Sequence, residues 1–198
     1  MKVIEIFESI QGEGSFLGVP AIFIRLGGCN LHCSFCDTKN SWGNQGTEVG
    51  IEDIAIAIEA SALTPKIVVI TGGEPTIYGD ELYTLAAQLQ KLGKKVHLET
   101  NGSSDIRPGY FNWVVCSPKE EIAYRVCEYA NELKYVVTPE FDPAENISEH
   151  ILKKYEGYIW LQPEGSDMKN MWKKAAELVK KYPELRVGVQ LHKIMEVQ

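Results

Sequence analysis

The sequence predicts an α/β fold, namely a partial, open (β/α) TIM-like barrel with a mostly parallel sheet. Short apolar runs alternate with amphipathic helical patterns along the chain, and most of these runs lack strict apolar/polar alternation. Such runs suit parallel strands that are covered on both faces, and the alternation with helices predicts βαβ units. A complete eight-fold barrel needs about 250 residues, whereas this chain has 198. We therefore expect an open barrel with its site at the carboxyl ends of the strands.

Eight segments rich in β-branched or aromatic residues are expected to form the strands. They cover residues 3–7, 21–26, 67–70, 96–99, 113–116, 133–137, 158–161 and 186–189. The clearest helix spans residues 80–92, because leucines recur on one face and Gly93 stands where a helix would stop. Two further helices are indicated by apolar residues at helical spacing, namely Ile51, Ile54 and Ile58, and Met171, Ala175, Leu178 and Tyr182.

The composition, with 44% hydrophobic and 24% charged residues, is typical of a globular domain. No linker or repeat interrupts the chain, so we expect one domain over residues 1–198. The formal net charge of −7 disfavours a nucleic-acid partner. No apolar run approaches membrane-spanning length, and Glu5 stands where a secretory signal would need apolar residues. A cytoplasmic protein that binds neither nucleic acid nor a membrane is expected.

Three of the five cysteines, Cys29, Cys33 and Cys36, form a C-x3-C-x2-C loop directly after the expected strand 21–26. A disulfide framework is not expected in the cytoplasm, so this grouping predicts a metal centre. Three thiolates can hold three corners of a 4Fe-4S cluster and leave the fourth iron open for another ligand. A structural zinc ion is the alternative, with a fourth ligand from His32, Cys116, Cys127 or a distant histidine.

The cysteine loop, with aromatic Phe35 before its last cysteine, resembles that of the radical S-adenosylmethionine superfamily. The segment Thr71-Gly72-Gly73-Glu74-Pro75 follows a strand and is similar to the superfamily's Gly-Gly-Glu-Pro segment, which contacts the amino group of the cofactor. Glycines expose backbone carbonyls there, and an ammonium group needs such acceptors. The resemblance implies a 4Fe-4S cluster on the three cysteines, S-adenosylmethionine as cofactor, and a partial barrel of the radical SAM type.

Polar residues at the ends of successive strands are expected to bind this cofactor. Glu99-Thr100-Asn101-Gly102 resembles the ribose- or methionine-facing segment of the superfamily, although alone it would indicate only an Asn-Gly turn. The expected cofactor-binding residues are Gly73, Glu74, Glu99, Asn101, Ser117, Pro118, Lys119, Gln162, Pro163, Glu164 and Gly165.

A narrower resemblance lies outside this common core. The segment 8–14, Arg25, Cys36-Asp37-Thr38 and the segment 190–193 resemble the 7-carboxy-7-deazaguanine synthase family, which acts in queuosine biosynthesis. That family implies a carbon–nitrogen lyase that contracts the ring of 6-carboxy-5,6,7,8-tetrahydropterin to 7-carboxy-7-deazaguanine with loss of ammonia. No side chain is expected to be catalytic, because the cofactor supplies the radical.

The residue types suit such a substrate. Arg25 offers a planar fork to a carboxylate, while Gln11 and Glu13 offer donors and acceptors to a pterin edge. The expected substrate-binding residues are Ile10, Gln11, Gly12, Glu13, Arg25, Thr71, His192 and Gln198. The resemblance further implies Mg²⁺ on Thr38, whose hydroxyl oxygen is a reasonable ligand for a hard cation.

The resemblance also implies an N-terminal substrate-binding segment, a C-terminal extension that closes the site, a homodimer, and an electron donor such as flavodoxin or ferredoxin. Two alternatives stay open. One is an activase that installs a glycyl radical on a partner protein, since such enzymes share the cysteine loop. The other is a non-catalytic α/β module that a zinc ion stabilises.

Overall fold

The computed structural model describes residues 1–43, 45–62, 64–119 and 129–197. Its centre is a nine-stranded sheet in the order β3-β1-β2-β4-β5-β6-β7-β8-β9. The strands are β1 (Lys2–Ile10), β2 (Pro20–Leu26), β3 (Thr47–Glu48), β4 (Ile67–Gly72), β5 (Lys95–Thr100), β6 (Trp113–Cys116), β7 (Glu132–Val137), β8 (Tyr158–Pro163) and β9 (Leu185–Val187).

Seven strands, β2 and β4 to β9, pair in parallel, and β1 and β3 extend the sheet with antiparallel pairings. Strands β3 and β9 occupy opposite ends of the order, so the barrel is open as expected. All eight expected strands are confirmed. The sequence missed β3 because two residues carry no apolar pattern.

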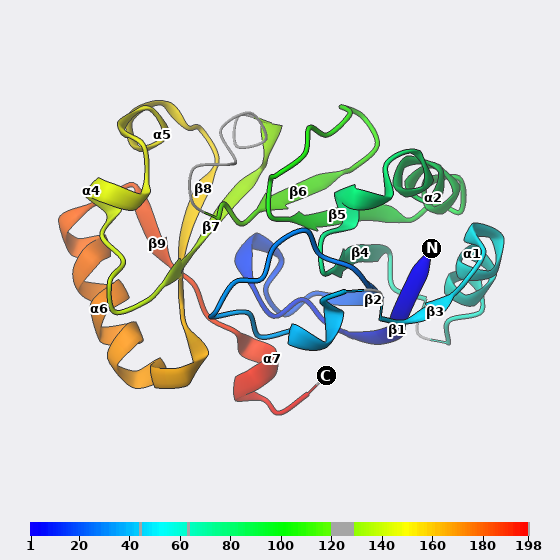
Figure 1. Cartoon of the computed structure of the whole chain (residues 1–198), viewed down its shortest axis with the longest axis horizontal. Coiled ribbons are helices and arrows are strands. Elements are labelled where there is room, and N and C mark those ends of the chain that lie inside the picture. The colour runs from blue at the N-terminus through cyan, green and yellow to red at the C-terminus, as the bar shows by residue number, and fades with distance from the viewer. Residues whose placement is uncertain (44, 63, 120–128, 198) are drawn as a thin grey trace.

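Helices cover the outside of the curved sheet, with α1 and α2 near one end and α6 near the other (Figure 1). The three expected helices are confirmed, and in the described part of the chain the sequence missed three short ones, because four to six residues hold too little periodicity. The helices are α1 (Ile51–Glu59), α2 (Asp80–Lys91), α4 (Pro143–Asn146), α5 (Glu149–Lys154), α6 (Met168–Lys181) and α7 (Leu191–Ile194). Within the described residues, no helix has the length and apolar character to cross a membrane.

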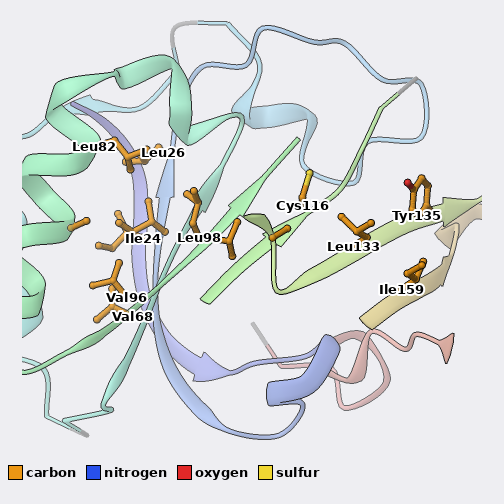
Figure 2. Close-up of a cluster of buried hydrophobic side chains, with 14 of the residues drawn as sticks. Ile24, Leu26, Val68, Leu82, Val96, Leu98, Cys116, Leu133, Tyr135 and Ile159 are labelled. Atoms are coloured by element: carbon orange, nitrogen blue, oxygen red, sulfur yellow. The ribbon is translucent and has the colours of Figure 1, made fainter. Parts of the chain in front are cut away.

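The core lies between the helices and the outer face of the sheet. Alternate strand residues such as Ile24 and Leu98 are fully buried there against helical residues such as Leu82 (Figure 2). Each buried side chain of this size contributes about 1.5–3 kcal/mol relative to an exposed one. Cys116 is also fully buried in this cluster and packs as a small apolar residue.

The inner face of the sheet is apolar at its base, as the strand sequences predict, because Ala21, Ile67 and Val69 form a second buried cluster there with Phe16 and Phe23 packed against it. The Phe16 ring also packs against His97 and Trp113, with ring centroids 4.5 and 5.1 Å away. Nearer the carboxyl ends of the strands, Glu99 and Lys134 line a cavity. The barrel interior thus changes from apolar at its base to polar near the carboxyl ends of the strands.

Candidate functional site

A cavity of about 430 Å³ lies at the carboxyl ends of the parallel strands. The cysteine loop, the loop after β1, the strand ends and α7 all contribute to its wall. The expected site residues that line it are Ile10, Gln11, Gly12, Glu13, Arg25, Cys29, Cys33, Cys36, Thr38, Thr71, Gly73, Glu99, Asn101, Ser117, Lys119, Gln162, Pro163, Glu164, Gly165 and His192.

The cysteine loop is held against the end of β4 by backbone contacts. Glu74 N donates to Gly28 O at 2.8 Å, and a Cβ on Gly73 would lie only 1.9 Å from that same oxygen. Gly28 itself has a φ of 86°, which favours glycine. The glycines on both sides are therefore required for this close approach, which brings the loop to the cavity.

The three thiols of the cysteine loop lie together at the cavity. Cys29, Cys33 and Cys36 are half-buried and all line it. Three thiolates there could hold three corners of a cubane cluster and leave the fourth iron open towards the cavity.

The surroundings of Cys29 disfavour its thiolate form, so a bound metal would have to supply positive charge. Burial raises the pKa of Cys29, and the nearby Glu74 carboxylate adds to that, although the Leu31 amide, 3.5 Å from Sγ, favours the thiolate. Bound iron would provide the positive charge that a buried thiolate needs.

Glu74 and Pro118, both expected to bind the cofactor, do not line the cavity. The Glu74 carboxylate is fully buried. One of its oxygens accepts hydrogen bonds from Thr76 N and Oγ1 and from Thr100 Oγ1, and the other accepts from Asn101 N. Its side chain therefore joins the ends of β4 and β5 beneath the cavity wall.

Lys134, in the middle of β7, was missed by the sequence analysis. Its Nζ donates to Glu13 Oε2 at 2.6 Å and to Glu99 Oε2 at 2.9 Å. A lysine flanked by buried Leu133 and Tyr135 was the available signal, because a charge inside an apolar strand needs a partner.

Lys134, Glu13 and Glu99 form a buried trio, and burial and the ion pairs together set the pKa of each member. Burial disfavours the Lys134 ammonium, but Glu13 and Glu99 outweigh burial and raise the pKa of Lys134 above its usual range. Burial opposes ionisation of Glu13 as well, yet Lys134 holds the pKa of Glu13 below its usual value. Burial wins at Glu99, whose pKa is raised despite the same lysine.

Segment 190–193 connects the loop after β1 with the cysteine loop. Gln190 Nε2 donates to Glu13 Oε1 at 2.8 Å and to Asp37 Oδ2 at 3.2 Å, and Lys193 Nζ donates to Asp37 at 2.7 Å. His192 stands against Gly12, where a Cβ would lie 2.0 Å from Nδ1. Burial lowers the pKa of His192.

The remaining expected residues have defined neighbours. Arg25 Nε donates to Glu5 at 2.6 Å, and its guanidinium lies 5.6 Å from the Phe7 ring centroid. Thr38 Oγ1 donates to Asp37 Oδ1 at 3.1 Å. Lys119 Nζ donates to Ser117 Oγ at 2.5 Å. Gln198 and Cys127 lie outside the described residues.

Comparison with known proteins agrees with this geometry. Residues 23–111 match the Radical SAM superfamily. The chain is 36% identical to a 7-carboxy-7-deazaguanine synthase of Bacteroides thetaiotaomicron, over 100% of this chain and 98% of the relative. It is 37% identical to a synthase of the same name from Aquifex aeolicus, over 98% and 93%.

Solved structures show the same likeness. The crystal structure of QueE from Escherichia coli superposes with a TM-score of 0.82 at 32% identity, covering 96% of this chain and 94% of that one. SuiB of Streptococcus suis bound to S-adenosylmethionine, at 16% identity and a TM-score of 0.52, covers 80% of this chain and 44% of its own and shares the fold. The zinc-module alternative conflicts with the superfamily match, and the activase alternative gains no support from these relatives.

Proposed function

Because the chain belongs to the 7-carboxy-7-deazaguanine synthase family of radical SAM enzymes, we propose that it contracts 6-carboxy-5,6,7,8-tetrahydropterin to 7-carboxy-7-deazaguanine, with loss of ammonia. The observation that carries the proposal is a single cavity in which the cysteine loop faces Glu13, Arg25 and His192. A cluster and a small polar substrate would share that space.

The three cysteines would hold a 4Fe-4S cluster, and S-adenosylmethionine would lie along the strand ends. When bound, the cluster and this cofactor supply the radical chemistry. Gly73 and Asn101 lie on the cavity wall, and Gly73 presents backbone acceptors to the ammonium group of the cofactor. Ser117, Lys119 and residues 162–165 would bind its remaining polar groups.

The substrate would bind between the loop after β1 and the end of β2. Arg25 would receive the carboxylate, because the ion pair with Glu5 uses Nε and a guanidinium has further N–H donors at its end. Gln11 and Glu13 would bind the pterin edge. The adjoining Ile10, Gly12, Thr71 and His192 complete the wall.

Thr38 would bind Mg²⁺ together with substrate oxygens and water. Its hydroxyl lines the cavity next to the Asp37 carboxylate, and oxygen donors are what Mg²⁺ prefers. Asp37 is held as a carboxylate, since Lys193 and Gln190 outweigh burial and keep its pKa below the usual value. The site therefore offers an oxygen donor and a negative charge to a hard cation.

The proposal extends to the whole chain and its partners. Residues 1–198 would act as one radical SAM domain in a cytoplasmic homodimer, with the C-terminal segment closing the site. An electron would come from flavodoxin or ferredoxin. The contact of α7 with Gly12, through Leu191 N to Gly12 O at 2.9 Å, supports a closing role for this segment.

Anaerobic reconstitution tests the proposal. Protein loaded with iron and sulfide should convert 6-carboxytetrahydropterin to a deazaguanine and ammonia when S-adenosylmethionine, Mg²⁺ and a reductant are present. The control is the same pterin without its carboxylate, which should react poorly because Arg25 loses its partner. A loaded protein that cleaves S-adenosylmethionine but yields no deazaguanine would contradict the assignment.

A further inference from the structure

Lys134 is a buried cation that the proposed chemistry does not use. It stands on the inner face of β7, while Leu133 and Tyr135 on either side of it point into the core (Figure 2). The side chains of Lys134, Glu13 and Glu99 are 17%, 14% and 18% exposed, and both ion pairs are shorter than 3 Å. An ion pair this buried is costly to break, because removing one partner leaves an uncompensated charge.

The same strand holds the loop after β1 at a second point. Glu132, two positions before Lys134, accepts a hydrogen bond from Ser15 N at 2.9 Å. Gly14 lies between the two contacts at a φ of 66°, and a Cβ there would come within 2.2 Å of Glu132 Oε2. The inner face of β7 therefore sets both the position of this loop and the direction of the Glu13 side chain.

We propose that Lys134 is a positioning residue, which holds the Glu13 carboxylate at the cavity as an ionised acceptor for a heterocycle edge with N–H donors, while its ammonium is shared with Glu99. Two buried carboxylates so close together cannot both ionise without a cation between them. Lys134 itself spends two of its three donors on the carboxylates. This inference rests on the proposed function, in which Glu13 meets the pterin edge.

The electrostatics of the cavity support this role. Without the ammonium, burial would raise the pKa of Glu13 as it already raises that of Glu99, so Glu13 would take up a proton more readily and stop accepting. The other charged or titratable groups that face the trio are Asp37, Lys119, Glu132, His192 and Lys193. Of the two other lysines, Lys193 forms an ion pair with Asp37, and Lys119 donates to Ser117 Oγ.

The experiment compares Lys134→Met with Lys134→Arg in reconstituted holoenzyme. Substrate affinity is measured as a function of pH by anaerobic titration with 6-carboxytetrahydropterin. K134M should weaken binding on the order of 100-fold, as losing one partner of a buried charge pair does. The acid limb of its binding profile should move to higher pH by about one unit. K134R, which keeps the charge, should recover most of the affinity and the normal acid limb.

Matched controls separate this role from general damage. Lys174→Met removes an ammonium that donates to Thr138 O and Pro139 O on the outside of the barrel, and it should leave affinity and acid limb unchanged. Iron content and thermal midpoint are recorded for every variant. If K134M does not fold, Glu13→Gln takes its place, and it too should weaken binding and flatten the acid limb.

The outcomes are distinct. K134M with normal affinity and a normal acid limb overturns the inference, as does K134R that binds no better than K134M, or E13Q with unaltered affinity. Wild-type holoenzyme that carries its cluster and does not bind the pterin refutes the proposed function instead, and this inference falls with it.

Discussion

The two halves of the cavity are built in different ways. In the cysteine half, backbone contacts and glycines press two short segments together, residues 27–38 and 71–74. In the half proposed for the substrate, hereafter the substrate half, side-chain charges join distant elements: Glu13 meets Lys134 across 121 positions and Gln190 across 177. The first half should therefore be sensitive to changes of ligand and backbone, and the second to changes of charge.

The largest effect is expected when a cysteine of the cysteine half is removed. Cys33→Ala removes one corner ligand, so the loss of S-adenosylmethionine cleavage should exceed the roughly 100-fold cost of losing an outer-shell partner at a metal site. Iron and sulfide per chain and cleavage of the cofactor measure it. Cys116→Ala is the control, since this buried thiol packs in the core. A Cys33→Ala protein with full cluster and undiminished cleavage would refute the cluster assignment.

The next largest effect is expected from Glu74, whose side chain joins the ends of β4 and β5 beneath the cysteine half. Glu74→Ala leaves the donors of Thr76, Thr100 and Asn101 without their acceptor, and it should lower the free energy of unfolding by about 3 kcal/mol. Denaturant unfolding under anaerobic conditions measures this. Exposed Glu184→Ala should change it by less than about 0.5 kcal/mol. Equal effects of the two changes would show that the buried carboxylate does not hold the strand ends.

Gln190 links Glu13 of the substrate half to Asp37 of the cysteine loop, and a charge change there should lower substrate affinity. Gln190→Glu places a third carboxylate beside Glu13 and Asp37, and substrate affinity should fall about tenfold, because like charges within hydrogen-bond distance repel. Gln190→Met removes the same hydrogen bonds without adding charge, so it should have the smaller effect. If both variants keep the cluster and lose affinity equally, the hydrogen bonds and not the charges hold this half.

The smallest expected effect concerns His97, at the base of the barrel below both halves. Burial, helped by Lys95, lowers the pKa of His97 from 6.5 to about 4. Above pH 6.5 the imidazole is neutral in both states, and below it the unfolded chain binds the proton first, so stability is lost as the pH falls towards 4. Between about pH 7.5 and about pH 5.5, the wild type should lose about 1 kcal/mol more than His97→Phe.

Unfolding at the two pH values measures that difference. His97→Phe keeps an aromatic ring against Phe16, whose centroid lies 4.5 Å from the imidazole. Identical pH dependence of wild type and variant would mean that His97 titrates in the folded barrel as it does in the unfolded chain.

Much of the fold could be read from the sequence, because apolar periodicity is local. The strands and the three longer helices each carry enough residues to show their pattern, whereas β3 and α7 do not. The antiparallel place of β1 at the sheet was invisible too, since strand direction depends on which neighbour it meets.

The sequence alone determined the close grouping of Cys29, Cys33 and Cys36 at the end of β2, because the thiols and the glycines beside them are separated by short spacings. Only the tertiary structure decided where two side chains lie. Glu74 is buried beneath the cavity wall, and Lys134 lies between Glu13 and Glu99. Charge interactions depend on distance in space and on burial, and separation along the chain reports neither.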